Sequence, residues 1–107
     1  MNSGLELEGT LTFFVKHRNP DWTVDADTYR FPEVRREPVS VSAVKRPDGS
    51  IDVVLTGPFG GEYSFNHPIP PCDQRGLQIG LTWVRNRVML YLNGELCQTK
   101  SAVNLVH

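Results

Sequence analysis

The stretch from Gly76 to Thr99, GLQIGLTWVRNRVMLYLNGELCQT, constrains the fold of this chain more than any other part of the sequence. Large apolar residues alternate with small or polar ones in 78–84 and again in 88–92, a pattern typical of strands that bury one face. The pair Asn93-Gly94 follows, and it is preferred in two-residue type I′ turns because both turn positions need a positive φ. The stretch therefore predicts three consecutive antiparallel strands.

The turn and a tight connection through Arg85 and Asn86 define a register for these strands. The residues set opposite each other are Trp83 and Val88, Leu81 and Leu90, Leu92 and Glu95, and Leu90 and Cys97. One face of the predicted sheet carries Leu77, Ile79, Leu81, Trp83, Val88, Leu90, Leu92 and Cys97. The other face carries Gln78, Thr82, Met89, Tyr91, Leu96 and Gln98. A slip by one residue would mix the two groups, so the pattern supports the register and assigns Trp83 to the core.

The rest of the chain also predicts strands and turns. Eight prolines and nine glycines divide it into short segments, and no segment shows helical periodicity over two or more turns. Leu11 to His17 alternates, with Phe14 on the outward side, and 39–43 and 51–55 alternate around a hairpin turn at 46–50. We therefore expect an all-β protein in which 1–107 forms a single small domain.

The segment from His17 to Glu37, HRNPDWTVDADTYRFPEVRRE, lacks clean alternation. Part of it, Thr23 to Phe31, is interpreted as an irregular or edge strand, and Val103, Leu105 and Val106 predict a short last strand. Long loops in compact domains are usually functional or disordered, and the aromatic residues of this segment argue against disorder. The segment is therefore a candidate binding region.

Composition excludes several classes of function. The net charge of −1 comes from 11 basic and 12 acidic residues spread along the chain, so nucleic-acid binding is not expected. No apolar stretch is long enough to span a membrane, and the first residues lack the pattern of a secretory signal. If Met1 is the native start, we expect a cytoplasmic protein in which Cys72 and Cys97 stay reduced. Two cysteines and three scattered histidines make no zinc ligand set.

The motifs in 76–99 resemble the core of laminin-G-like domains in the concanavalin A-like lectin/glucanase superfamily. In those domains a strand ending in Thr-Trp is followed by a short turn, a strand ending in Leu-Tyr-hydrophobic-Asn-Gly, and a third short strand. Here the matching residues are Thr82-Trp83 and 90–94, and the segment 11–16, LTFFVK, is similar to an early strand of the same domains. The resemblance covers most of the chain and implies an antiparallel β-sandwich of the concanavalin A-like jelly-roll type, reduced in size.

One departure from the family pattern concerns length. The chain has little room for the first and last strands that normally complete the two sheets. Either the sandwich is reduced, or a second subunit covers an exposed sheet edge. We favour a homo-oligomer, and the expected interface consists of the outward residues Phe14, Met89, Tyr91 and Leu96.

Glycosidase members of this superfamily carry closely spaced carboxylates on one strand, because retaining chemistry needs two carboxyl groups about 5–5.5 Å apart. The candidates here are Glu6-Leu7-Glu8 and Asp25-Ala26-Asp27, and the third carboxylate of the family pattern is missing from the first pair. Without burial, these acids have no reason to hold a raised pKa. We therefore predict no catalytic residues and no enzyme activity.

Calcium is a second use for the acids of the long segment. Asp25 and Asp27, with the main chain and Asn19 or Asp21 nearby, supply the oxygen ligands that calcium prefers. Laminin-G-like domains often bind calcium, but these aspartates do not align residue by residue with the ligands of the family. The favoured alternative is two exposed loop acids, so no metal ligand is assigned.

A carbohydrate is the ligand that the residues themselves favour. Sugars place apolar C–H faces on aromatic rings and bond carboxylates and amides through their hydroxyls. Trp22, Asp25, Asp27 and Tyr29 provide these groups in the long segment, and Asn19 is a further candidate. In the alternative interpretation, which is favoured for the two aromatics, Trp22 and Tyr29 close one end of a small sandwich. The function predicted is a non-catalytic carbohydrate-binding module, and the alternative is a structural or self-associating domain without a small ligand.

Overall fold

The computed structural model describes residues 9–37, 39–57, 62–72, 75–84 and 87–101. These residues form strands, turns and irregular segments, and no helix occurs among them. The strands are β1 (Gly9–Val15), β2 (Tyr29–Arg30), β3 (Val34–Arg36), β4 (Val39–Lys45), β5 (Ser50–Thr56), β6 (Glu62–Pro68), β7 (Leu77–Val84), β8 (Arg87–Leu92) and β9 (Glu95–Ser101). The prediction of an all-β protein is confirmed for this part of the chain.

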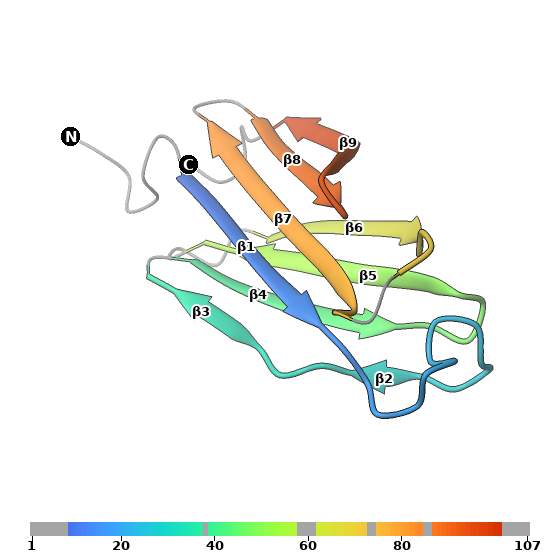
Figure 1. The fold of residues 1–107 in the computed structure, drawn as a ribbon. Coiled ribbons are helices and arrows are strands. Elements are labelled where there is room, and N and C mark those ends of the chain that lie inside the picture. Colours follow the sequence, from blue (N-terminus) through green and yellow to red (C-terminus); the bar gives the residue numbers. More distant parts are fainter. Residues whose placement is uncertain (1–8, 38, 58–61, 73–74, 85–86, 102–107) are drawn as a thin grey trace.

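The strands form two antiparallel sheets. Sheet A has the order β1-β7-β8-β9, and sheet B has the order β2-β4-β5-β6 with β3 also paired to β4. The strands β2 and β3 pair with opposite ends of β4, so together they make one edge of sheet B. Figure 1 shows the sheets as two layers whose strands cross. The fold is therefore a β-sandwich.

A single apolar core lies between the sheets, because alternate residues of the strands point inward. Sheet A contributes Leu11, Val15, Leu77, Ile79, Leu81, Trp83, Val88, Leu90 and Leu92. Sheet B contributes Val39, Val41, Ala43, Ile51, Val53, Leu55, Tyr63 and Phe65. Trp83 is 4% exposed, as its place in the predicted pattern implies.

The predicted register holds between β7 and β8 and for the pair Leu92 and Glu95, but it fails further along β9. Trp83 lies opposite Val88, and Leu81 lies opposite Leu90. Leu90 lies opposite Gln98 instead of Cys97, because the pairing of β8 and β9 shifts between Leu90 and Tyr91. A shift of this β-bulge type leaves an extra residue in one strand and changes the face of those that follow. The expectation that Gln98 lies on the outer face is therefore wrong.

The inward side chains of β9 close one side of the sandwich. Gln98 Nε2 donates a 2.6 Å hydrogen bond to the Asn66 carbonyl, and Lys100 Nζ donates to the Ser64 carbonyl. Both acceptors belong to the edge strand β6, and the Lys100 ammonium also lies 5.2 Å from the centre of the Phe65 ring. The bulge thus allows polar side chains to join the neighbouring edges of the two sheets.

The segment 17–37 contains less regular structure than expected, because the irregular or edge strand predicted for Thr23 to Phe31 is shorter in the structure. Only Tyr29 and Arg30 pair as β2, and the sequence analysis missed the short strand β3. The acids Glu6 and Glu8, the connection at 85–86 and the strand expected at 103–106 lie outside the described residues.

The turn after β8 is the predicted Asn-Gly turn. Asn93 and Gly94 have φ values of 53° and 85°, and Leu92 lies opposite Glu95. The Asn93 side chain also holds two neighbours: its Oδ1 accepts from the Gln78 amide at 3.0 Å, and its Nδ2 donates to the Pro71 carbonyl at 3.0 Å. Asn93 therefore fixes the turn and attaches it to β7 and to the segment before β7.

Two substitutions at Asn93 should separate these roles. Asn93→Gly keeps the positive φ but removes two hydrogen bonds, so we expect a loss of about 1–3 kcal/mol in the free energy of unfolding. Asn93→Ala should lose about 1 kcal/mol more, because alanine is disfavoured in the left-handed region. Urea denaturation of both variants measures the difference, and equal losses would show that the backbone conformation does not matter.

Candidate functional site

The long segment 17–37 folds around a buried lysine from outside the segment, Lys45 of β4. This residue was not singled out from the sequence. In β4 the inward positions are Val39, Val41, Ala43 and Lys45, and Lys45 is 0% exposed. It lies directly opposite Tyr29 in the pairing of β4 with β2. A buried ammonium is unfavourable unless its donors are all satisfied, so the chain around it must supply acceptors.

The segment between β1 and β2 supplies these acceptors. Lys45 Nζ donates to the Asp25 carbonyl, to Asp25 Oδ1 at 2.9 Å and to the Asp27 carbonyl at 2.9 Å. An ammonium has three N–H donors, and these three oxygens match them in number. The ammonium also lies 5.7 Å from the centre of the Tyr29 ring, within the range of a cation–π contact. The segment is therefore folded around a charge that belongs to sheet B.

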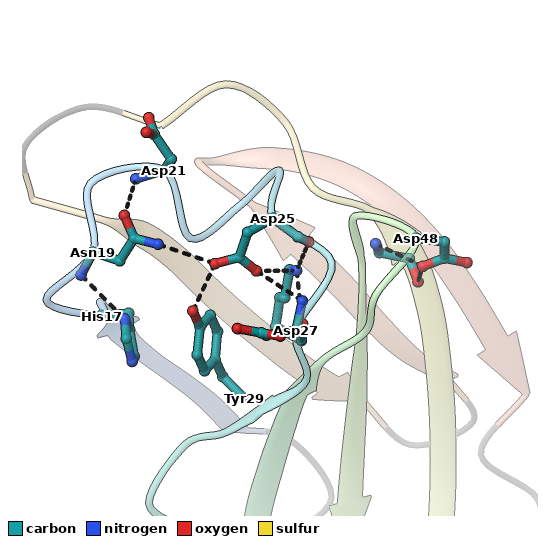
Figure 2. A network of polar contacts seen from close by, with 9 residues as sticks. His17, Asn19, Asp21, Asp25, Asp27, Tyr29 and Asp48 are labelled. Atoms are coloured by element: carbon teal, nitrogen blue, oxygen red, sulfur yellow. Dashed lines mark hydrogen bonds and ion pairs between the residues drawn. The ribbon is translucent and has the colours of Figure 1, made fainter.

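Asp25 is the hub of the surrounding network, which Figure 2 shows. Its second carboxylate oxygen, Oδ2, accepts from the Tyr29 hydroxyl at 2.6 Å and from Asn19 Nδ2 at 3.1 Å. The hydrogen bond from Tyr29 and then the one from Lys45 lower the pKa of Asp25 from 3.8 to about 2. The same bond to Asp25 raises the pKa of Tyr29. Asp25 is thus held as a carboxylate by its partners.

Two further contacts order the segment. The His17 ring stacks on the Tyr29 ring with 3.8 Å between centroids, and His17 Nδ1 accepts from the Asn19 amide at 3.1 Å. Asn19 Oδ1 accepts from the Asp21 amide at 3.0 Å, whereas the Asp21 carboxylate points away from the cluster in Figure 2. The network therefore runs from His17 to Lys45.

These contacts bear directly on the predicted ligand residues. Asp25 and Tyr29 lie together as predicted, but both oxygens of the Asp25 carboxylate already accept hydrogen bonds from within the protein. Asp27 is exposed, and its backbone carbonyl accepts a hydrogen bond from Lys45 Nζ. The cation at the centre of these oxygens is the Lys45 ammonium. Among the described residues, no three His, Cys, Asp or Glu side chains gather closely enough to hold a metal.

Trp22 lies in the core, in line with the alternative interpretation of this residue. It is 4% exposed and makes an edge contact with the Phe31 ring, with 5.4 Å between centroids. A shallow pocket of about 550 Å³ lies beside the segment, lined by Lys16, His17, Arg18, Pro20, Trp22, Cys72 and Gly76. The small exposed area of Trp22 leaves little of its ring for a sugar, so its main contribution is to packing.

The two cysteines are thiols on separate segments. Cys72 Sγ donates to the Pro70 carbonyl at 3.3 Å, and Cys97 Sγ donates to the Glu95 carbonyl at 3.4 Å. Both side chains are half-buried and pack against the apolar core.

A second candidate site lies on the outer face of sheet A, where the register aligns side chains in rows across the strands. One row contains Thr12, Gly80, Tyr91 and Leu96, and a neighbouring row contains Thr10, Thr82, Met89 and Thr99. Phe14 lies opposite Gln78 in the next row. The face thus combines hydroxyl groups, an amide and aromatic rings.

A hollow of about 230 Å³ forms in this face around Gly80, and we call it the Gly80 hollow. Its lining consists of Thr10, Thr12, Gln78, Gly80, Thr82, Tyr91 and Gly94. None of these side chains is charged. Thr12 and Tyr91 flank Gly80 on the two adjacent strands, and the Thr10 and Thr82 hydroxyl oxygens lie 3.5 Å apart in the neighbouring row.

Neither the backbone nor crowding requires glycine at position 80. Gly80 has no positive φ, and a Cβ there would lie 3.4 Å from the Tyr91 Cβ, which is ordinary van der Waals contact. Glycine within a strand costs roughly 0.5–1 kcal/mol relative to alanine. A strand glycine of this kind often marks a place where a ligand approaches the backbone closely.

The residues expected at an interface share this outer face. Phe14 is 48% exposed and Leu96 is 54% exposed, whereas Met89 and Tyr91 are half-buried. The Arg75 guanidinium lies 5.7 Å from the centre of the Phe14 ring. Met89, Tyr91 and Leu96 adjoin one another on β8 and β9, whereas Gln78 and the threonines of β1 and β7 separate Phe14 from them.

Sequence reasoning missed two residues that organise these sites. The signal for Lys45 was available, because it continues the inward alternation of 39–43 by two residues. The signal for Gly80 was its place within an apolar alternation, between Ile79 and Leu81, where no turn is expected.

Removing the Lys45 charge should destabilise the whole protein. Lys45→Met keeps the aliphatic part of the side chain but removes the ammonium that donates to Asp25 Oδ1 and to the carbonyls of Asp25 and Asp27. We expect the melting temperature to fall by roughly 10 °C or more in calorimetry. The matched control is Arg46→Met, which removes the half-exposed Arg46–Asp52 ion pair of 2.7 Å. This control should lower the melting temperature by about 5 °C or less. Equal changes would contradict the role of Lys45.

Acid should destabilise the protein through Asp25. Because the pKa of Asp25 is lowered to about 2 in the folded state, its contribution to stability is complete above its ordinary pKa of 3.8 and is lost as pH falls toward 2. Tyr29→Phe removes the largest cause of the shift, so its stability should fall less over this range. Chemical denaturation between pH 5 and pH 2 measures both slopes. Tyr91→Phe is the control, and a wild-type slope in Tyr29→Phe would refute the coupling.

The fold and the sites were compared with known proteins. No family model matches the chain, and no match was found among the curated proteins or the solved structures. In the described residues, no helix is long and apolar enough to cross a membrane. The laminin-G-like resemblance therefore remains a prediction from the motifs at 82–83 and 90–94.

Proposed function

We propose that this protein is a non-catalytic carbohydrate-binding module with a laminin-G-like fold of the concanavalin A-like jelly-roll type. Its ligand site is the Gly80 hollow on the outer face of sheet A. The observation that carries the proposal is the glycine itself, which opens the face beside Tyr91 although neither its φ nor crowding requires it.

The chemistry of the lining suits one neutral sugar ring. Tyr91 offers an aromatic surface for the apolar C–H face of the ring. Thr10, Thr12 and Thr82 offer hydroxyl groups, and Gln78 offers an amide. The volume of about 230 Å³ is below the range of about 300–1,000 Å³ for sites that hold drug-sized ligands, which fits a single sugar residue.

A binding role fits these groups better than a catalytic one. The lining contains no carboxylate, imidazole or thiol to act as acid, base or nucleophile. The long segment 17–37 is a weaker candidate for the ligand, because Trp22 is buried and the carboxylate of Asp25 is bonded within the protein. The motif residues Thr82 and Tyr91 both line the hollow, which links the family resemblance to the proposed site.

Filling the hollow should abolish binding without unfolding the protein. The probe is an array of neutral oligosaccharides, followed by calorimetric titration of any glycan that binds. We expect Gly80→Val to lose binding because its side chain fills the hollow, and its melting curve, recorded beside that of wild type, separates this loss from unfolding. Tyr91→Ala should weaken binding by about tenfold or more, through loss of the aromatic surface.

The control for both variants is Thr99→Val, which changes the same face outside the hollow and should bind like wild type. Binding that survives both Gly80→Val and Tyr91→Ala would contradict the proposed site. A blank array together with a stable dimer would favour the alternative, a self-associating domain without a small ligand.

A further inference from the structure

Unpaired strand edges expose backbone N–H and C=O groups that can pair with another chain, and proteins protect them in recognisable ways. Among the described residues, sheet A ends at β1 and β9, and sheet B ends at β6 and at the edge shared by β2 and β3. These four edges differ sharply in their protection.

The edges of β6 and β9 are protected by each other. The side chains of Gln98 and Lys100 donate to the carbonyls of Asn66 and Ser64 in β6. β9 itself carries a register shift of the β-bulge type and the charge of Lys100. Bulges and lysines are both common means of preventing edge pairing.

The edge formed by β2 and β3 is protected by its shortness and its charge. β2 has two residues, and β3 has three, of which Arg35 and Arg36 are exposed. Arg35 lies 4.0 Å from the Glu37 carboxylate. A second chain would find a short and highly charged edge here.

β1 lacks these features in the described part of the chain. Its seven residues, GTLTFFV, contain no charge and no proline, and its pairing with β7 runs through all seven positions without a shift. Two neighbouring aromatic residues lie on this edge strand: Phe13 is half-buried on the core side, and Phe14 is 48% exposed on the outer side. A regular, uncharged edge with exposed apolar side chains is the kind that pairs with another strand.

We propose that β1 is a dimerisation edge, which pairs antiparallel with β1 of a second copy across a two-fold axis at Thr12. This register uses all seven residues, because it sets Gly9 opposite Val15, Thr10 opposite Phe14 and Leu11 opposite Phe13. The pairs also keep the two faces of the sheet, since Leu11 and Phe13 both point to the core side. A second copy is the fitting occupant because the strand is complementary to itself and brings no like charges together.

The pairing joins the two copies of sheet A into one eight-stranded sheet. The outer faces become continuous, so the two Gly80 hollows lie on one surface with Thr12 of both copies between them. Five strand spacings separate the two Tyr91 residues, or about 24 Å. The dimer does not depend on the proposed ligand, although it would present two ligand sites on one face.

Sedimentation equilibrium of the whole chain without ligand tests the proposal over about 1–200 µM, because dimer formation follows mass action. We expect wild type to approach twice the monomer mass at the upper end. Thr12→Lys places two ammonium groups together at the axis, so it should stay monomeric, with a melting temperature equal to that of wild type at dilutions where wild type is monomeric. Thr99→Lys adds the same charge on the exposed face of β9 and should dimerise like wild type.

A covalent trap tests the register and does not require Thr12→Lys to fold. Opposed residues in an antiparallel pair have Cα atoms about 4.5–5.5 Å apart, within the range of a disulfide. Mild oxidation should therefore crosslink the Thr12→Cys variant to a dimer much faster than the Thr99→Cys variant. A wild type that stays monomeric over the whole range, or equal crosslinking of the two variants, would overturn the proposal.

Discussion

The buried ammonium of Lys45 determines how the long segment before β2 can be used. Its burial between the sheets is acceptable only because Asp25 and Asp27 surround it with three oxygens, and these in turn hold Asn19, Tyr29 and His17 in place. A segment that looked like a ligand loop from its composition is therefore part of the framework. The positive charge that these acids bond is supplied by β4 itself.

Because these acids bond within the protein, the outer face of sheet A is the stronger candidate for a ligand site. There the outer face is polar at its threonines and aromatic at Tyr91, and Gly80 leaves a hollow between them. The side chains of this face are held by strand pairing, and Asn93 fixes the turn next to it. Rigid strands position binding groups more accurately than loops do, which supports the site proposed on this face.

The sequence allowed prediction of the features that depend on neighbouring residues. Alternation and the Asn-Gly turn were enough to place 77–92 in the correct register, including the burial of Trp83. The bulge in β9 was not predictable, because the residues that follow Cys97 in this strand are polar and no apolar alternation fixes their face. The capping of β6 by Gln98 depends on that bulge and on the distance between two sheets, so it was also missed.

In the candidate site too, contacts between residues close in sequence could be predicted, whereas contacts with distant residues could not. The residues Asp25 and Tyr29 were expected to lie together, and they do, but their common partner is Lys45, 16 residues beyond Tyr29 in the chain.

The central claim is that the contacts of Lys45 make the long segment part of the framework, and native hydrogen exchange tests it most directly. Because the contacts with Lys45 hold the segment in place, we expect the amides of Trp22 and Asp25 to be protected nearly as well as those of β4 and β5. Rapid exchange of these amides while the strands stay protected would show that the segment is a mobile loop, and would contradict the account.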